Sequence, residues 1–244
     1  MACGFDSRHL LLIKNMKLYI SDQHFFHENA NLSLDKRGFK NVLEMNSYMI
    51  EKWNSKVLGG DQIIVLGDMF LLNKNPLQEQ SAENQSKKIN YVLNRLKGKI
   101  CLVKGNHDNS WLNLEGVNLN RFEWIKDYAE LKDGENLVVL SHYPIFCYNH
   151  QYLLNKDGSA RTFMLYGHVH NTHDEVLVNE FQNLTRKTEL CGKNGNRKIP
   201  CNMINCFCMF SDYAPLSLAE WKQVDSARRA KISVPENYVI KDIE

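Results

Sequence analysis

The stretch Ile63–Asp68 constrains the fold of this chain more than any other. Four apolar residues, three of them β-branched, are followed by Gly67 and Asp68. Such a run is typical of a strand buried on both faces and ended by a turn. The strand would deliver the Asp68 carboxylate to the edge of a sheet. A Gly-Asp turn often does no more than cap the next helix, so the role of Asp68 depends on the rest of the chain.

Four further strand-like stretches end in residues that can bind a metal ion. The stretches are Met16–Ile20, Ile100–Val103, Leu137–Leu140 and Phe163–Tyr166. The residues that follow them are Asp22 and His24, Asn106 and His107, His142, and His168 and His170. Because ligands of α/β sheets bind where strands finish, all five ends can converge on one crevice. Oxygen and imidazole donors without thiolates suit Mn, Fe, Zn or Ni.

Asp68 is the natural bridge in a site with two metal ions. Two dications about 3.5–4 Å apart repel each other, so such a site needs an anion between them. The carboxylates of Asp22 and Asp68 leave two dications with a net positive charge, which suits a phosphate. Each of Gly67, Gly105 and Gly167 precedes a proposed ligand, and a turn this tight often needs a residue without a Cβ. The i, i+2 spacing of His168 and His170 predicts that both rings point the same way and that Val169 points into the core.

The motifs resemble, in their order, the five-part signature of the calcineurin-like metallophosphoesterase family. They are Asp22-x-His24, Gly67-Asp68, Gly105-Asn106-His107-Asp108, His142 and Gly167-His168-x-His170. The resemblance implies an α/β fold, a four-layer α/β/β/α sandwich of two mixed sheets flanked by helices. It implies one metal ion held by Asp22, His24, Asp68 and His170, and another held by Asp68, Asn106, His142 and His168. His107 would be the catalytic residue that protonates the departing alkoxide.

The expected activity is hydrolysis of a phosphoester bond by two divalent metal ions, with manganese favoured over Fe, Zn or Ni. A phosphodiesterase for a nucleotide or another small phosphodiester is favoured, and a phosphomonoesterase or a nuclease is the alternative. The second and third motifs depart from those of protein phosphatases, which use Gly-Asp-x-Val-Asp-Arg-Gly and Asn-His-Glu. A non-catalytic binding or scaffold protein of this fold would be expected to lose ligands, and this chain has them all.

Three further features stay open at this stage. His27, beside Phe25 and Phe26, is a candidate substrate-binding residue, although a surface histidine next to two core aromatics fits equally well. Arg161 is a second candidate for binding the phosphate, but a lone arginine is more often solvated. The apolar run Met69–Leu72 predicts either a pocket wall or the face of a homodimer.

The remaining pattern predicts helices in the first half of the chain and hairpins in the second. Helices are expected over Met45–Val57, over Ile89–Leu96 and after a capping box at Ser217–Glu220. A hairpin is expected at Tyr128–Leu140, a loop or hairpin tip at Thr185–Lys198 and a strand within Ile199–Phe210. Residues 1–15 are expected to be a disordered extension, and residues 16–244 a single domain.

Charge and cysteine content restrict the partners and the compartment. The 30 Lys and Arg residues nearly balance the 28 Asp and Glu residues, so the charge does not indicate a nucleic-acid partner, although one stays open. Seven cysteines, an odd number, fit no disulfide framework, which suits a reducing cytoplasm. No apolar run is long enough to span a membrane. We therefore expect a cytoplasmic enzyme with a small phosphoester substrate.

Overall fold

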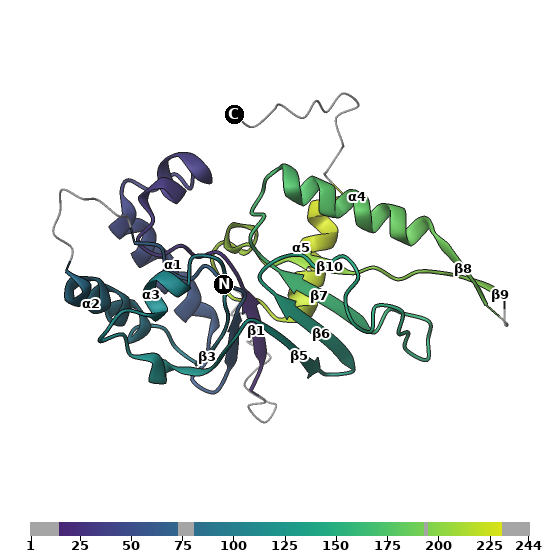
Figure 1. Cartoon of the computed structure of the whole chain (residues 1–244), viewed down its shortest axis with the longest axis horizontal. Coiled ribbons are helices and arrows are strands. Elements are labelled where there is room, and N and C mark those ends of the chain that lie inside the picture. Colours follow the sequence, from purple (N-terminus) through teal and green to yellow (C-terminus); the bar gives the residue numbers. More distant parts are fainter. Residues whose placement is uncertain (1–14, 73–80, 193–194, 231–244) are drawn as a thin grey trace, which may run out of the picture.

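The computed structural model describes residues 15–72, 81–192 and 195–230. The expected extension at 1–15 lies outside these residues except for Asn15. Two four-stranded sheets form the centre of the molecule (Figure 1). The first contains β1 (Lys17–Ile20), β2 (Gln62–Val65), β3 (Lys99–Val103) and β4 (Phe122–Lys126), all parallel. The second has the order β10-β7-β6-β5, from β5 (Tyr128–Asp133), β6 (Asn136–Ser141), β7 (Thr162–Tyr166) and β10 (Met203–Asn205). Only its β5 is antiparallel.

Helices cover the outer faces of both sheets. On the first sheet lie α1 (Val42–Lys56), α2 (Ala82–Leu93) and the short α3 (Asn109–Leu112), and on the second lies α4 (His173–Lys187) (Figure 1). The last helix, α5 (Leu218–Arg229), packs where the edges of β1 and β10 meet. Its Trp221 Nε1 donates a hydrogen bond to the Tyr19 carbonyl at 2.8 Å. The described residues also form a π-helix at Ala30–Leu34 and two short 3₁₀-helices, at Leu119–Arg121 and Cys208–Ser211.

Alternating residues of each central strand enter different core layers. Ile63 and Val65 of β2 pack with Trp53 of α1 in the outer layer, whereas Ile64 and Leu66 face the second sheet. In the second sheet Leu165 faces inward, while the side chains on either side of it pack toward α4. Both faces of β2 are therefore buried, as its apolar run predicts, and the expected four-layer α/β/β/α fold is confirmed. Only the second sheet is mixed, however, because every pair of the first sheet is parallel.

The free edge of β10 is covered by side chains. Gln182 of α4 donates from Nε2 to the Met203 carbonyl at 3.1 Å and accepts from the Met203 amide at 2.9 Å. Arg229 of α5 donates to the same carbonyl at 2.8 Å. The carboxamide of Gln182 thus makes the two bonds that a neighbouring strand would make.

Most predicted elements are confirmed, including the Tyr128–Leu140 hairpin and the capping box, in which Ser217 and Glu220 bond each other reciprocally. Three expectations need correction. The segment Thr185–Lys198 begins inside α4 and only then forms a hairpin of β8 (Glu189–Gly192) and β9 (Gly195–Lys198). Within Ile199–Phe210, where the pattern indicates strand character throughout, only Met203–Asn205 forms a strand.

The third correction concerns Met69 and Phe70, which we expected at a pocket wall or a homodimer face. Both are fully buried, and the Phe70 ring packs edge-on against Trp111 with 5.0 Å between the ring centres. All six cysteines in the described part of the chain are free. No helix within the same ranges is both long and apolar enough to cross a membrane.

Candidate metal centre

The loops after β1, β2, β3, β6 and β7 meet at one end of the two sheets and bring the seven proposed ligands together. In a first group, His170 Nε2 lies 3.6 Å from Asp22 Oδ1 and 3.2 Å from His24 Nε2. These three side chains are buried. Each can turn one donor atom toward a common point. The group can therefore hold one metal ion.

A second group adjoins the first. Asp22, Asp68 and His142 also place one donor atom each within 4.8 Å of one another. Asn106 Oδ1 lies 3.0 Å from His142 Nε2 and 3.0 Å from His168 Nδ1. Asp68 Oδ2 lies between the groups, 3.8 Å from His24 Nε2 and 3.6 Å from His142 Nε2.

The donor chemistry of the site fits a cation. His142 Nδ1 is 2.8 Å from the Leu66 carbonyl, which can only accept, so this nitrogen carries a proton. The other ring nitrogen, Nε2, faces the Asn106 amide oxygen, which is an acceptor. Two acceptors at this distance repel each other unless a proton or a metal ion lies between them. Divalent metal ions thus suit these residues.

Asp35 orients the ring of His170, as the Leu66 carbonyl orients the ring of His142, by accepting a hydrogen bond from Nδ1. The carboxylate of Asp35 is 2.6 Å from His170 Nδ1, which leaves Nε2 for the site. Burial disfavours the charged ring, but the carboxylates of Asp22 and Asp35 outweigh it and raise the pKa of His170 to about 9. In the metal-free protein a proton on Nε2 therefore takes the place that a cation would take.

The two site carboxylates differ in their proton affinity. For Asp22 burial would raise the pKa, but His170, with His142 and His24, holds it well below its usual range. Burial raises the pKa of Asp68 to about 6, against the effect of His142 and with the help of the Asp22 charge. The centre thus carries protons near neutral pH that a divalent cation would displace.

Five of the seven proposed ligands have left-handed backbone conformations. The φ angles are 56° for Asp22, 49° for His24, 53° for Asp68, 69° for His168 and 47° for His170. Such a conformation costs a residue with a Cβ about 1–2 kcal/mol, and it recurs at functional sites. The i, i+2 prediction for His168 and His170 assumes extended backbone, and left-handed turns are found there instead. Val169 does point into the core, where it is 5 % exposed.

The expected glycines allow the loops to touch. A methyl group on Gly105 would lie 2.6 Å from the Asp68 amide nitrogen, and one on Gly67 would lie 2.7 Å from the Gly105 amide nitrogen. Gly67 also has a φ of +91°, which favours glycine. At Gly167 the added carbon would lie 2.5 Å from Asp22 Oδ2. No side chain fits at these three positions unless the site moves.

Asp108, which the third motif contains without an assigned role, fastens two of these loops together. It is fully buried. Its Oδ2 accepts from the amides of Asp68 and Gly105 at 2.8 and 2.7 Å. Its Oδ1 accepts from the Met69 amide and from Trp111 Nε1. The Asp108 carboxylate therefore fixes the backbone of the bridging acid.

Sequence reasoning missed a buried ion pair beside the first group. The side chain of Arg37 is inaccessible and pairs with Asp35, with Nη2 and Oδ2 2.7 Å apart. The same guanidinium donates to the backbone carbonyls of Asp22 and Gln23. In the sequence, the one sign of this pair is that an acid and a base lie two residues apart, at Asp35 and Arg37. They follow a segment without regular periodicity, so nothing connects them to the metal motifs. Arg37 thus connects the carboxylate that orients His170 to the loop that carries Asp22.

The substrate side is a cavity of about 230 Å³ next to the metal-competent groups. His107 lines it, with Nε2 3.8 Å from Asp68 Oδ2 and 41 % of its side chain exposed. His27 lines it too, and burial lowers the pKa of its ring to about 4. Arg161 does not belong to this cavity. It directly precedes β7, whereas His168 and His170 follow that strand, so it lies at the opposite end of the sheet.

Comparisons with known proteins identify the family and agree with the fold. A sequence model of the family described as calcineurin-like phosphoesterase matches residues 18–190. An uncharacterized protein of Methanocaldococcus jannaschii, MJ1445, is 31% identical over 158 residues, which cover 64% of this chain and 71% of that protein. The crystal structure of AQ665 from Aquifex aeolicus, a protein of unknown function, aligns with a TM-score of 0.56 and 22% identity, over 86% of this chain and all of that one.

The family match spans more than half of the chain and contains every motif of the site. The family implies divalent metal ions, for which the buried groups around Asp22 and Asp68 offer ligands. It also implies a phosphoester substrate. The chain therefore belongs to the calcineurin-like phosphoesterase family and is a hydrolase that acts on phosphoester bonds.

Proposed function

We propose that the protein hydrolyses a small phosphodiester with two divalent metal ions, and that manganese is the active metal. The position of Asp68 carries this proposal, because one of its oxygens lies within 4 Å of a histidine from each group. A carboxylate in that position offsets the repulsion between two dications. One ion would be held by Asp22, His24, Asp68 and His170. The other would be held by Asp68, Asn106, His142 and His168.

The bound metal ions would supply positive charge for the phosphate oxygens and lower the pKa of the attacking water. The protein residues supply the orientation. Leu66 and Asp35 fix which nitrogen of His142 and of His170 is free to bind. His107 Nε2 faces the cavity and would give its proton to the departing alkoxide oxygen, a role typically worth about 10²–10⁴-fold in rate. His27, neutral at pH 7, would donate a hydrogen bond to the substrate.

The charge of the cavity favours a diester over a monoester. A phosphomonoester carries nearly two negative charges at pH 7, whereas a diester carries one. No Arg or Lys is among the described residues that line the cavity, and the Asp174 carboxylate is at its wall. Leu34 adds apolar surface for an organic group. The second charge of a monoester would therefore meet no protein cation.

Two chromogenic substrates test the proposal. With protein loaded with Mn²⁺, kcat/KM for bis-p-nitrophenyl phosphate should exceed that for p-nitrophenyl phosphate by about tenfold or more, which corresponds to about 1.4 kcal/mol in the transition state. Asp174→Asn removes a negative charge from the cavity wall, so it should raise kcat/KM for the monoester and lower the ratio of the two kcat/KM values. A preference for the monoester would refute the diester assignment. Elemental analysis that finds one metal ion per chain in the fully active protein would refute the dinuclear centre.

A further inference from the structure

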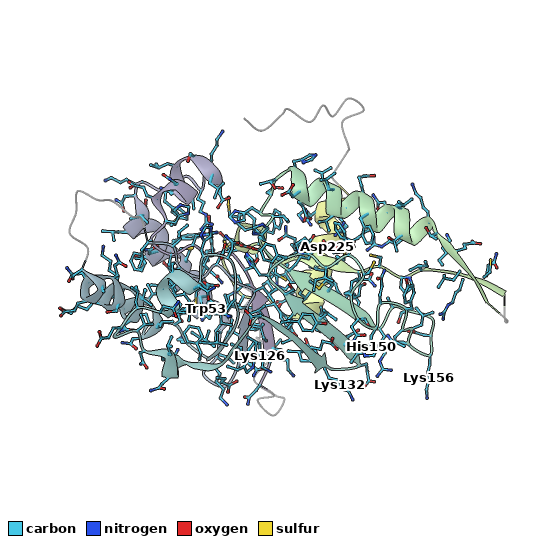
Figure 2. The ribbon with its side chains drawn as sticks, in the orientation of Figure 1. Trp53, Lys126, Lys132, His150, Lys156 and Asp225 are labelled. Atoms are coloured by element: carbon cyan, nitrogen blue, oxygen red, sulfur yellow. The ribbon has the colours of Figure 1, made fainter. Side chains whose placement is uncertain are left out.

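A second cavity, of about 430 Å³, lies at the other end of β7 from the metal centre. It lies between α4, α5 and the edge strand β10, where Figure 2 labels Asp225 on α5. Phe163, near the start of β7, lines it, whereas His168 follows the end of that strand. Five residues of extended chain separate the two positions, which corresponds to about 16 Å. The cavity is therefore distinct from the phosphoesterase site.

The cavity carries excess positive charge. Arg186, Lys222 and Arg229 line it, and Asp225 is the one acid among the described lining residues. Both oxygens of Asp225 are already engaged, by Arg228 at 3.2 Å and by Arg229 at 2.7 Å. Among the described lining residues, Arg186 and Lys222 therefore have no carboxylate within ion-pair distance.

Within the described part of the chain, the hydrogen bonds of these two cations go to neutral acceptors, while Asp225 and Asp133 act on Arg186 and Lys222 only through longer-range attraction. Arg186 donates to the Cys201 carbonyl at 2.7 Å and to Gln182 Oε1 at 3.0 Å. Lys222 Nζ lies 3.7 Å from the centre of the Phe163 ring and 3.4 Å from Asn136 Oδ1. Burial lowers the pKa of both side chains, and for Arg186 the charge of Arg229 lowers it further. Half-buried cations without an ion-pair partner are stabilised by an anion.

A buried donor in the cavity also lacks an acceptor. Asn202 Nδ2 is inaccessible and has no hydrogen-bond partner among the described residues. Its backbone amide donates to Tyr148 Oη and its carbonyl accepts from the Met164 amide. The strand pairing therefore does not use the Asn202 side chain. An unpaired buried donor destabilises the folded protein, and an acceptor bound in the cavity would remove that cost.

We propose that this cavity binds the phosphate group of a small phosphorylated molecule. Arg186 and Lys222 supply the charge, and Asn202 Nδ2 and the Ser226 hydroxyl supply neutral donors. The volume lies within the 300–1,000 Å³ range of small-molecule sites, so it leaves room for an organic group beside the phosphate. The Phe163 ring under Lys222 offers that group an apolar surface. The site goes beyond the proposed reaction and does not depend on it.

Isothermal titration calorimetry on the full chain tests this proposal with two probes, inorganic phosphate and phenylphosphonate, whose C–P bond a phosphoesterase does not cleave. The metal centre is expected to bind phosphate too, so each titration is also run on Asp68→Asn protein. Lys222→Met removes the charge but keeps an aliphatic chain on Phe163, and Asn202→Ala removes only the unpaired amide. Lys187→Gln removes one charge from an exposed position of the same helix as Arg186 and is the control.

The proposal predicts that phosphate binding persists in Asp68→Asn and weakens at least tenfold when either cavity substitution is added. Lys187→Gln should change the affinity less than twofold. Without phosphate, Asn202→Ala should not destabilise the protein, because it removes an unsatisfied donor. Tighter binding of phenylphosphonate than of inorganic phosphate would support a phosphorylated organic ligand. Equal binding of the two probes would limit the ligand to phosphate itself and overturn the proposal of an organic group beside it. Loss of all binding in Asp68→Asn, or equal weakening in Lys187→Gln, would overturn the site.

Discussion

Replacing Gly105 by alanine tests how closely the loops of the metal centre must approach. The added methyl group would lie 2.6 Å from the Asp68 amide nitrogen and 2.8 Å from Asp68 Cγ, whereas ordinary contacts begin at 3.4 Å. The Asp68 backbone would have to move by about 1 Å. It cannot move alone, because Asp108 Oδ2 holds the amides of Asp68 and Gly105 together. The substitution therefore displaces the bridging carboxylate and loosens the clamp that holds it.

The expected effect is larger on catalysis than on stability. A displacement of about 1 Å in a catalytic constellation can cost roughly 10²-fold in rate. Overpacking of a buried position typically costs about 1–3 kcal/mol of folding free energy. We therefore expect Gly105→Ala to remain folded, to bind Mn²⁺ at least tenfold more weakly and to hydrolyse bis-p-nitrophenyl phosphate about 10²-fold more slowly. Titration calorimetry, steady-state kinetics and urea unfolding measure the three quantities.

Gly59→Ala is the matched control. No atom lies within 4 Å of the carbon that it adds. Its metal affinity and turnover should match those of the wild type, and its stability should differ by less than about 1 kcal/mol. Gly105→Ala protein with wild-type metal affinity and turnover would refute the argument that the loops must touch at this glycine.

Four further predictions follow from the site. His107→Ala should keep both metal ions by elemental analysis but lose about 10²–10⁴-fold in kcat, whereas Asp68→Ala should lose the metal ions; metal loss in His107→Ala would contradict its assignment as a proton donor. Asp35→Asn should weaken Mn²⁺ binding about 10–100-fold, because the carboxylate no longer orients His170, and an unchanged dissociation constant would remove that role. The His170 pKa of about 9 lies above the ordinary 6.5, so metal must displace a proton from this ring below pH 9. The apparent affinity of wild-type protein should rise with pH, by up to about tenfold per unit between pH 7 and 9, and a flat titration profile would contradict that coupling. Removal of metal by a chelator should abolish turnover and lower the melting temperature, with recovery of both on addition of Mn²⁺; full activity after verified removal would exclude a metal-dependent reaction.

The sequence predicted the strands and helices whose buried residues are apolar. The run at Ile63–Leu66 is buried on both faces, and its alternation places side chains in two core layers, as such a run requires. Helix α4 was missed for the opposite reason. Its buried face mixes the apolar Val178 with three polar residues, Glu175, Asn179 and Gln182, which bond to neighbouring groups and interrupt the apolar stripe. Apolar periodicity cannot reveal a helix that packs through polar contacts.

The candidate ligands could be named from the sequence because each follows a recognisable strand. The geometry that brings them together could not, since left-handed turns at Asp22, His24 and Asp68 are a consequence of the surrounding loops. Asp35 and Arg37 escaped notice because they follow a π-helix and contact the site only through the folded chain. Arg161 was misplaced because nearness in sequence to the last metal motif does not show on which end of β7 a residue lies.

The carboxamide of Gln182 at the margin of β10 protects the protein from pairing with other copies of itself through this strand. An unpaired strand margin is a template for intermolecular β-pairing and aggregation. Here Gln182 and Arg229 occupy both hydrogen-bonding groups of Met203. An incoming chain would have to displace both side chains before it could pair there, so this margin resists strand addition even though the strand is largely apolar.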